Sequence, residues 1–284
     1  MAQPANFGSL PEEYAKLDGA KIVVIPVPFD VTSTWIKGAD KGPEAIIRAS
    51  ANMELYDIES DSEVYLKGIY TDKAIEGELS PEGMVEAVRH KVQGHIKKDR
   101  FIVLIGGEHS VSIGSVKAHV ENNGDITVLQ LDAHCDLRDE YSGSKFNHAC
   151  VMARVRELCP ILQVGIRSMD SSEKQFLDRS RVFFAQDIYD RTDWMKDAIA
   201  KLTEKVYITI DLDVFDPSIM PSTGTPEPGG LSWYGVLALL KAVCHEKDVV
   251  GFDVTELCPN DRDRAPDFLA AKVIYKLLSY KFRV

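Results

Sequence analysis

Short runs of apolar, mostly β-branched residues recur along the chain, and longer stretches with helical periodicity separate most of them. Continuous apolar runs of this length are typical of strands buried on both faces of a parallel sheet. The pattern predicts eight strands, at residues 21–27, 63–70, 101–106, 126–132, 161–167, 182–188, 206–213 and 249–254. The run at 63–70 fits an edge strand or a loop equally well.

Helix signals lie between these runs. Pro43 marks the start of a predicted helix at 43–56, Ser80 and Pro81 precede one at 82–98, and Ser232 precedes one at 233–246. A last helix is expected from about 266 to 282. Alternating strands and helices favour parallel crossovers, so we expect a three-layer α/β/α fold with an eight-stranded, mostly parallel sheet. No Gly-, Ser- or Pro-rich stretch divides the chain, which predicts a single domain over residues 1–284.

The charge balance limits the partners. The 284 residues include 33 Lys and Arg against 44 Asp and Glu, a formal net charge of −11. Phosphate backbones and anionic lipids repel such a chain, so we expect no nucleic-acid and no membrane partner. The first 14 residues lack the features of a signal peptide, and no run of 18 apolar residues occurs. Five cysteines without CxxC spacing predict no disulfide framework and a cytoplasmic location.

Four predicted strands run directly into clusters of polar residues. The clusters are GGEHS at 106–110, DAHCD at 132–136, DLD at 211–213 and DVTE at 253–256. Ligands bind beyond the carboxyl ends of parallel strands, so we expect the four clusters to share one crevice.

The spacing within the clusters predicts a metal site. Residues two apart in extended chain face the same way, so the charged groups of DAHCD converge, as do those of DLD. Buried together without cations, these groups would be strongly unfavourable. The predicted ligands are more than one tetrahedral ion needs and suit two ions about 3.5 to 4 Å apart. Oxygen-rich ligands without thiolate favour Mn²⁺, although other divalent ions stay open. The predicted ligands are His109, Asp132, His134, Asp136, Asp211 and Asp213.

Each motif taken alone has a simpler explanation. GGEHS fits a tight strand-to-helix turn with a capping Ser110, and DLD fits a solvated strand end or a helix cap. DAHCD is harder to explain in this way, because three ionisable groups at the end of an apolar strand contribute nothing to hydrophobic packing. The presence of all three motifs in one chain favours the metal site.

Three segments resemble signatures of the ureohydrolase family of arginases and agmatinases: IGGEHSVSIG, VLQLDAHCD and TIDLDVFDPSIMPSTGTPEPGG. The resemblance implies an arginase-like fold, two Mn²⁺ ions per subunit held by the six residues above, and assembly into a homotrimer or homohexamer. It also implies that His148, in KFNHAC, shuttles protons and that Glu256, in DVTEL, receives a guanidinium group. The remaining histidines on expected helices are predicted to be surface groups: His90, His95, His119 and His245.

The sequence departs from common family patterns at three positions, none of them an expected metal ligand. Glu108 replaces a frequent Asp, Ala149 replaces the usual Gly after His148, and Thr209 replaces a frequent Ser. The methyl group of Ala149 is expected to narrow the substrate channel beside His148.

The resemblance implies hydrolysis of a guanidino compound to urea and a primary amine. In this scheme Glu256 orients the planar guanidinium by paired hydrogen bonds. Asp136 accepts a hydrogen bond from the attacking water and helps to protonate the leaving amine, and His148 relays protons to solvent.

Agmatine, giving putrescine and urea in polyamine biosynthesis, is the first choice of substrate, because DLRDEYSGSKFNHAC resembles agmatinases more than arginases. Asp139 and Glu140 in this segment would favour a cationic tail, but exposed loop charges are at least as often only solvated. Arginine, guanidinobutyrate and aminopropylagmatine stay open as substrates.

Two other classes of protein also stay open. One is a metal-dependent amide hydrolase of the deacetylase type, which the paired motifs and Glu256 argue against. The other is a non-catalytic homologue, which the intact ligand set disfavours.

Overall fold

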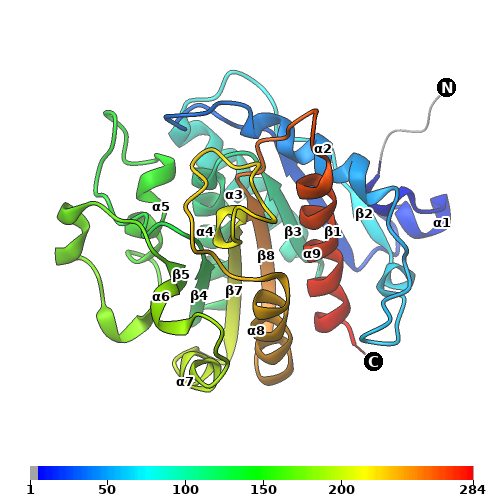
Figure 1. Ribbon diagram of the computed structural model, residues 1–284. Helices are drawn as coiled ribbons and strands as arrows, with labels where there is room; N and C mark the ends of the chain where they lie inside the picture. Colours follow the sequence, from blue (N-terminus) through cyan, green and yellow to red (C-terminus); the bar gives the residue numbers. More distant parts are fainter. Residues whose placement is uncertain (1–5, 284) are drawn as a thin grey trace.

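A twisted sheet of eight parallel strands forms the centre of the computed structural model, which describes residues 6–283 (Figure 1). The strand order is β2-β1-β3-β8-β7-β4-β5-β6, and every neighbouring pair is parallel. The strands are β1 (Ile22–Val27), β2 (Ile69–Thr71), β3 (Phe101–Gly106), β4 (Ile126–Leu131), β5 (Ile161–Ile166), β6 (Val182–Phe184), β7 (Lys205–Asp211) and β8 (Asp248–Thr255).

Helices cover both faces of this sheet. One apolar core joins it to α2, α7, α8 and α9, and a second core joins its other face to α3, α4 and α5. The predicted three-layer α/β/α fold is therefore confirmed. The helices are α1 (Glu12–Ala15), α2 (Gly42–Ser50), α3 (Pro81–Ile96), α4 (Ser112–Asn123), α5 (Val151–Val155), α6 (Ala185–Ile188), α7 (Trp194–Ala200), α8 (Trp233–Glu246) and α9 (Ala265–Lys281).

The helix starts follow from capping. The Ser80 hydroxyl accepts a hydrogen bond from the Gly83 amide at the start of α3, at 3.1 Å, and Pro81 occupies the first turn. Ser232 caps α8 in the same way, at 3.1 Å from the Gly235 amide. Both predicted starts are confirmed.

Three predicted elements differ in extent. The run at 63–70 is mainly a 3-10 helix, η3 (Val64–Lys67), followed by the short edge strand β2. The run at 182–188 divides into β6 and the one-turn helix α6. The helix expected over 43–56 ends as α2 at Ser50. Each difference lies at a sheet edge or an element end, where burial no longer enforces a regular period.

The surface position predicted for His119 is wrong. This residue lies on α4, is fully buried, and packs its ring 4.7 Å from the ring of Tyr207. Burial lowers the pKa of His119 to about 4, so the ring is neutral at physiological pH. A neutral imidazole against an aromatic ring fills the core under the sheet.

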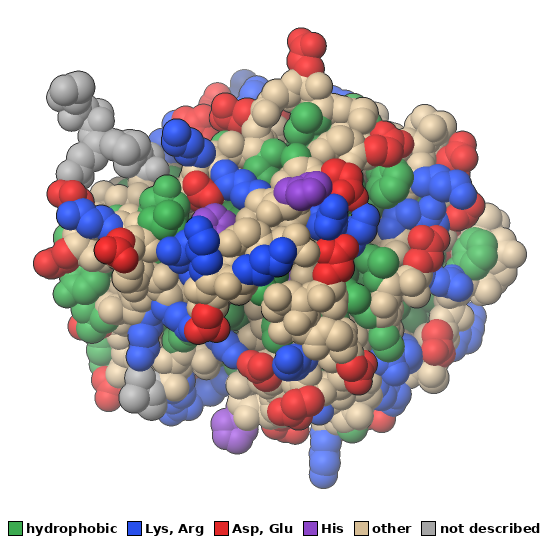
Figure 2. Space-filling model, turned by 180° about the vertical axis from the view of Figure 1, so that it is seen from behind, with side chains coloured by type: hydrophobic (Ala, Val, Ile, Leu, Met, Phe, Trp, Pro, Cys, Tyr) green, Lys and Arg blue, Asp and Glu red, His purple; other side chains and the backbone are tan. Residues whose placement is uncertain are grey.

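Within residues 6–283, no helix is long and apolar enough to cross a membrane. The five cysteines are all free thiols. Residues 1–5, part of the stretch from which no signal peptide is expected, and residue 284, the end of the expected domain, lie outside the described residues. On the face seen in Figure 2, Lys and Arg side chains alternate with Asp and Glu, so charge of one sign does not gather there.

Candidate metal centre

The strands that precede the four polar clusters are neighbours in the sheet, in the order β3, β8, β7, β4. Their carboxyl ends therefore meet at one place, at the upper edge of the sheet in Figure 1. A cavity of about 320 Å³ opens there. Asp132 is fully buried and does not itself line this cavity. The other predicted site residues line it: His109, His134, Asp136, His148, Asp211, Asp213 and Glu256.

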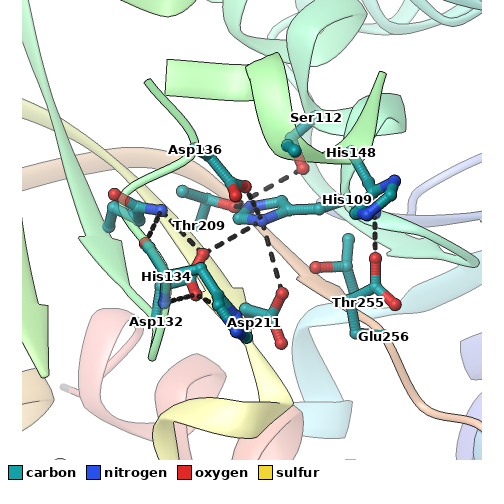
Figure 3. A network of polar contacts seen from close by, with 12 residues as sticks. His109, Ser112, Asp132, His134, Asp136, His148, Thr209, Asp211, Thr255 and Glu256 are labelled. Carbon is teal, nitrogen blue, oxygen red and sulfur yellow. Dashed lines mark hydrogen bonds and ion pairs between the residues drawn. The ribbon is translucent and has the colours of Figure 1, made fainter. Parts of the chain in front are cut away.

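His109 is surrounded by carboxylates (Figure 3). It begins the 3-10 helix η4 (His109–Val111), which follows β3, and is buried. Its Nδ1 atom lies 3.1 Å from Asp136 Oδ2, 3.2 Å from Asp132 Oδ2 and 3.4 Å from Asp211 Oδ2. Within residues 6–283, this nitrogen has no hydrogen-bond partner of acceptable geometry. One proton cannot serve three carboxylates, whereas a cation between them can.

The other nitrogen of His109 is fixed by a buried chain of hydrogen bonds. The Thr209 hydroxyl donates to Asp253 Oδ1 at 2.6 Å, so its oxygen accepts at 2.8 Å from His109 Nε2. Nε2 therefore carries the ring hydrogen, and the lone pair of Nδ1 points at the carboxylates. A metal-ligating histidine is held by the same kind of contact. The sequence indicated Thr209 only as a departure, and neither its role nor that of Asp253 was predicted.

His134 forms a second group. Its Nδ1 atom lies 2.9 Å from Asp213 Oδ2 and 3.7 Å from Asp132 Oδ1. Asp132 thus faces one histidine with each oxygen, and two sets of three possible ligands share it. The sets are His109, Asp132 and Asp211, and Asp132, His134 and Asp213. Two adjacent groups of possible ligands would suit a pair of divalent ions, which could activate water for hydrolysis.

Asp136 reaches the centre by a different route from the one predicted. β4 ends at Leu131, so the alternation of an extended strand does not continue through DAHCD. Asp136 instead has a φ of +54°, in the left-handed region, which turns its carboxylate back toward His109. The convergence of the three side chains is confirmed, but an irregular loop produces it.

Hydrogen bonds hold the carboxylates in place. Asp132 Oδ1 accepts from the His134 amide at 2.6 Å, and Oδ2 accepts from Gln130 Nε2 at 2.6 Å. Asp213 Oδ1 accepts from the Ala133 amide at 2.9 Å, which ties the loop after β7 to the loop after β4. The ligand oxygens are therefore positioned before any ion binds.

The electrostatics of this cluster favour cations. Burial would lower the pKa of His134, but Asp213 and Asp132 raise it to about 12. Burial and the neighbouring Asp213 raise the pKa of Asp211 well above its usual value. Both shifts show that the cluster has too little positive charge. The residues therefore fit a pair of divalent cations, by donor type, number and direction.

Glu256 stands beside this centre. It follows β8 with a φ of +68°, and its amide donates to the Gly107 carbonyl at 2.7 Å. Its Oε1 atom accepts from the His109 amide at 2.7 Å, and its carboxylate lines the cavity. Burial and the nearby Glu108 carboxylate raise the pKa of Glu256 well above its usual value. A cationic, planar ligand would restore the ionised form and match its two oxygens.

His148 lies across the cavity, at the start of η5 (His148–Cys150). Its amide donates to Thr32 Oγ1 at 2.9 Å, and the ring packs edge-on against Tyr141 with centroids 6.2 Å apart. Burial lowers the pKa of His148 to about 4, so the ring is neutral near pH 7. Thr32, in the loop after β1, gave no signal in the sequence.

The mouth of the cavity differs in part from expectation. Asp139 pairs with Arg154 at 2.6 Å, and neither it nor Glu140 lines the cavity. The structure therefore favours the second of the two interpretations of these charges, that they do not act on the substrate. Ala149 does line the cavity, as do the exposed side chains of Trp35 and Ile36. Apolar surface thus borders the opening.

The chain is similar to several known proteins over almost its whole length. The sequence model of the arginase family matches residues 20–279. N(1)-aminopropylagmatine ureohydrolase of Synechocystis sp. is 38% identical, covering 99% of this chain and 97% of that protein. The enzyme of the same name from Thermus thermophilus is 37% identical, covering 95% and 93%. The crystal structure of agmatine ureohydrolase of Thermoplasma volcanium matches with a TM-score of 0.84 at 30% identity, covering 94% and 91%.

Proposed function

The chain belongs to the arginase family and is a ureohydrolase, and on this premise we propose that it releases urea from a guanidino-alkylamine. The observation that carries this proposal is the pair of three-residue ligand groups that share Asp132, with the Glu256 carboxylate beside them in one cavity. In this proposal, hydrolysis takes place at the two ligand groups, and Glu256 binds the guanidinium cation that is hydrolysed.

We assign two divalent cations, preferably Mn²⁺, to the six predicted residues. His109, Asp211 and Asp136 would hold one ion, His134 and Asp213 would hold the other, and Asp132 would contact both. When bound, such a pair lowers the pKa of water from 15.7 to about 7 and so makes a nucleophile available near neutral pH.

Glu256 orients the substrate in this proposal. A guanidinium carries N–H groups in a planar fork, and a carboxylate accepts two of them side by side. The hydrogen bond from the His109 amide to Oε1 of Glu256 keeps this carboxylate next to the metal ligands. The central guanidinium carbon is therefore kept next to the metal ligands.

Asp136 and His148 handle protons. Asp136 faces His109 with Oδ2 and also lines the cavity, so its carboxylate can accept a proton from the attacking water and pass it to the leaving amine. His148 is 22% exposed at its side chain and can carry protons from the cavity to solvent through its ring.

For the substrate we prefer N(1)-aminopropylagmatine to the agmatine favoured by the sequence. Two relatives at 38% and 37% identity carry that name. The cavity mouth also supports it, because Trp35 and Ile36 offer apolar surface to a longer methylene chain. Agmatine is the second candidate, supported by the likeness to the Thermoplasma volcanium enzyme.

Urea release from a panel of guanidino compounds tests this choice. With Mn²⁺-loaded protein, we expect kcat/KM for N(1)-aminopropylagmatine to exceed that for agmatine by about tenfold or more, because more of the longer chain is bound. Arginine and guanidinobutyrate should be poorer, since each carries a carboxylate toward a site rich in carboxylates.

The same panel can contradict the proposal. A preference for agmatine would restore the sequence-based choice. No urea from any member would contradict the proposed function itself. An acetylated polyamine in the panel checks the deacetylase-type alternative, which predicts acetate instead of urea. Assembly as a homotrimer or homohexamer and a cytoplasmic location stay predictions.

A further inference from the structure

The loop after β1 is fastened to the segment that precedes His109. The Gly107 amide donates to the Val27 carbonyl and the Glu108 amide to the Phe29 carbonyl, both at 2.8 Å. A Cβ atom on Gly107 would lie 2.1 Å from the Phe29 carbonyl oxygen, so only glycine permits this approach. The contact brings Thr32 against the side chain of Glu108.

Glu108 is fully buried and directs both carboxylate oxygens at Thr32. Oε1 accepts from the Thr32 amide at 2.9 Å, and Oε2 accepts from the Thr32 hydroxyl. Such paired contacts hold a hydroxyl in one orientation. The oxygens of the ionised carboxylate can only accept, so in that state the single hydroxyl proton of Thr32 is committed to Glu108.

The Thr32 oxygen faces His148 as an acceptor. It accepts from the His148 amide at 2.9 Å and lies 3.4 Å from the ring atom Nδ1. Because its own proton points to Glu108, it can only accept from this nitrogen as well. A hydrogen bond between the two atoms therefore needs the ring hydrogen on Nδ1, which leaves the lone pair on Nε2.

We propose that Glu108 and Thr32 are positioning residues that fix the tautomer and orientation of His148, so that Nε2 is the atom that takes up and releases protons. This inference deepens the proposed function, because it rests on the proton-carrying role assigned to His148. It also gives a use to the carboxylate at position 108, which is neither an expected metal ligand nor exposed to substrate.

The loop that carries Thr32 also borders the substrate cavity. Asp30 shapes this loop by accepting from the Ser33 hydroxyl and from the Gly38 amide, the latter at 2.7 Å. Trp35 and Ile36 of the same loop line the cavity. The segment that carries Thr32 thus contacts the proton carrier and also borders the substrate cavity.

A matched pair of variants tests the assignment. Thr32→Val keeps the shape of the side chain but removes the hydroxyl, and we expect kcat to fall about 10- to 100-fold while KM and metal content stay unchanged. Thr32→Ser keeps the hydroxyl and should restore most of kcat. Equal losses in both variants, or loss of metal in Thr32→Val, would overturn the assignment.

A double-mutant cycle separates this role from a merely structural one. In a His148→Ala background no ring remains to be positioned, so Thr32→Val should change kcat by less than about twofold. If Thr32→Val costs the same factor in both backgrounds, its effect does not pass through the imidazole, and the proposal is wrong.

Nitrogen-15 NMR of histidine-labelled, Mg²⁺-loaded protein at pH 8 gives a readout that does not depend on turnover. The His148 resonance, identified by its loss in His148→Ala, should show the Nδ1–H tautomer in the wild type and a shift toward Nε2–H in Thr32→Val. An Nε2–H tautomer in the wild type would overturn the inference even if urea is released. An Nδ1–H tautomer in a protein that releases no urea would support the positioning and contradict only the proposed function.

Discussion

An Asp132→Asn variant is expected to lose both bound cations, and with them at least about a thousandfold in kcat for urea release. Asp132 is the residue that both ligand groups share, with Oδ2 3.2 Å from His109 Nδ1 and Oδ1 3.7 Å from His134 Nδ1. Asparagine keeps the shape but replaces one acceptor oxygen by an amide group that donates. Elemental analysis of the purified variant and its rate of urea release measure the two losses together.

Asp139→Asn is the matched control for this change. It removes a carboxylate from the loop that follows the same cluster, but from a side chain that pairs with Arg154 and does not line the cavity. This control should keep two ions per chain and ordinary turnover. If Asp132→Asn keeps two ions and full turnover, Asp132 is not a ligand that the two ions share.

A Glu256→Gln variant is expected to keep both ions but to lose about 100- to 1,000-fold in kcat/KM. In the wild type, the backbone amide of His109 donates to Oε1 of Glu256 at 2.7 Å. The side-chain oxygen of glutamine can accept the same hydrogen bond, so the metal ligands stay in place. What is lost is the negative charge that pairs with the guanidinium, and charge-assisted hydrogen bonds contribute about 1.5–3 kcal/mol each. Steady-state kinetics with parallel metal analysis separates this loss from a loss of ions.

Guanidinium ion offers an independent check on Glu256. It should inhibit the wild type as a competitor of substrate and should inhibit Glu256→Gln much more weakly. If both proteins show the same inhibition and the same kcat/KM, the substrate cation does not bind at this carboxylate.

The sequence located the clusters of the site because each follows a mainly apolar run that is typical of a strand buried on both faces. Polar residues at the end of such a strand cannot belong to the core, so DAHCD after β4 and DLD after β7 stand out without a structure. The place where the clusters meet could not be predicted without the order of the strands in the sheet. β4 lies next to β7 and β3 next to β8, and crossovers far apart in sequence decide these neighbours.

The supporting residues could not be predicted, because their contacts have no sequence spacing. Thr32 contacts Glu108 across 76 positions and His148 across 116, and Thr209 reaches His109 across 100. The left-handed backbone of Asp136 also left no pattern, since only a small fraction of residues other than glycine adopt that conformation. The two-residue period of an extended strand therefore predicted correctly that Asp136 lies beside the other ligands, but the structure reaches this position by another backbone conformation.

Anomalous diffraction from crystals grown with Mn²⁺ tests the two-ion centre most directly. We expect two manganese peaks about 3.5–4 Å apart, one beside Nδ1 of His109 and one beside Nδ1 of His134, with Asp132 between them. A single peak, or none among these side chains in protein prepared with ample Mn²⁺, would contradict it.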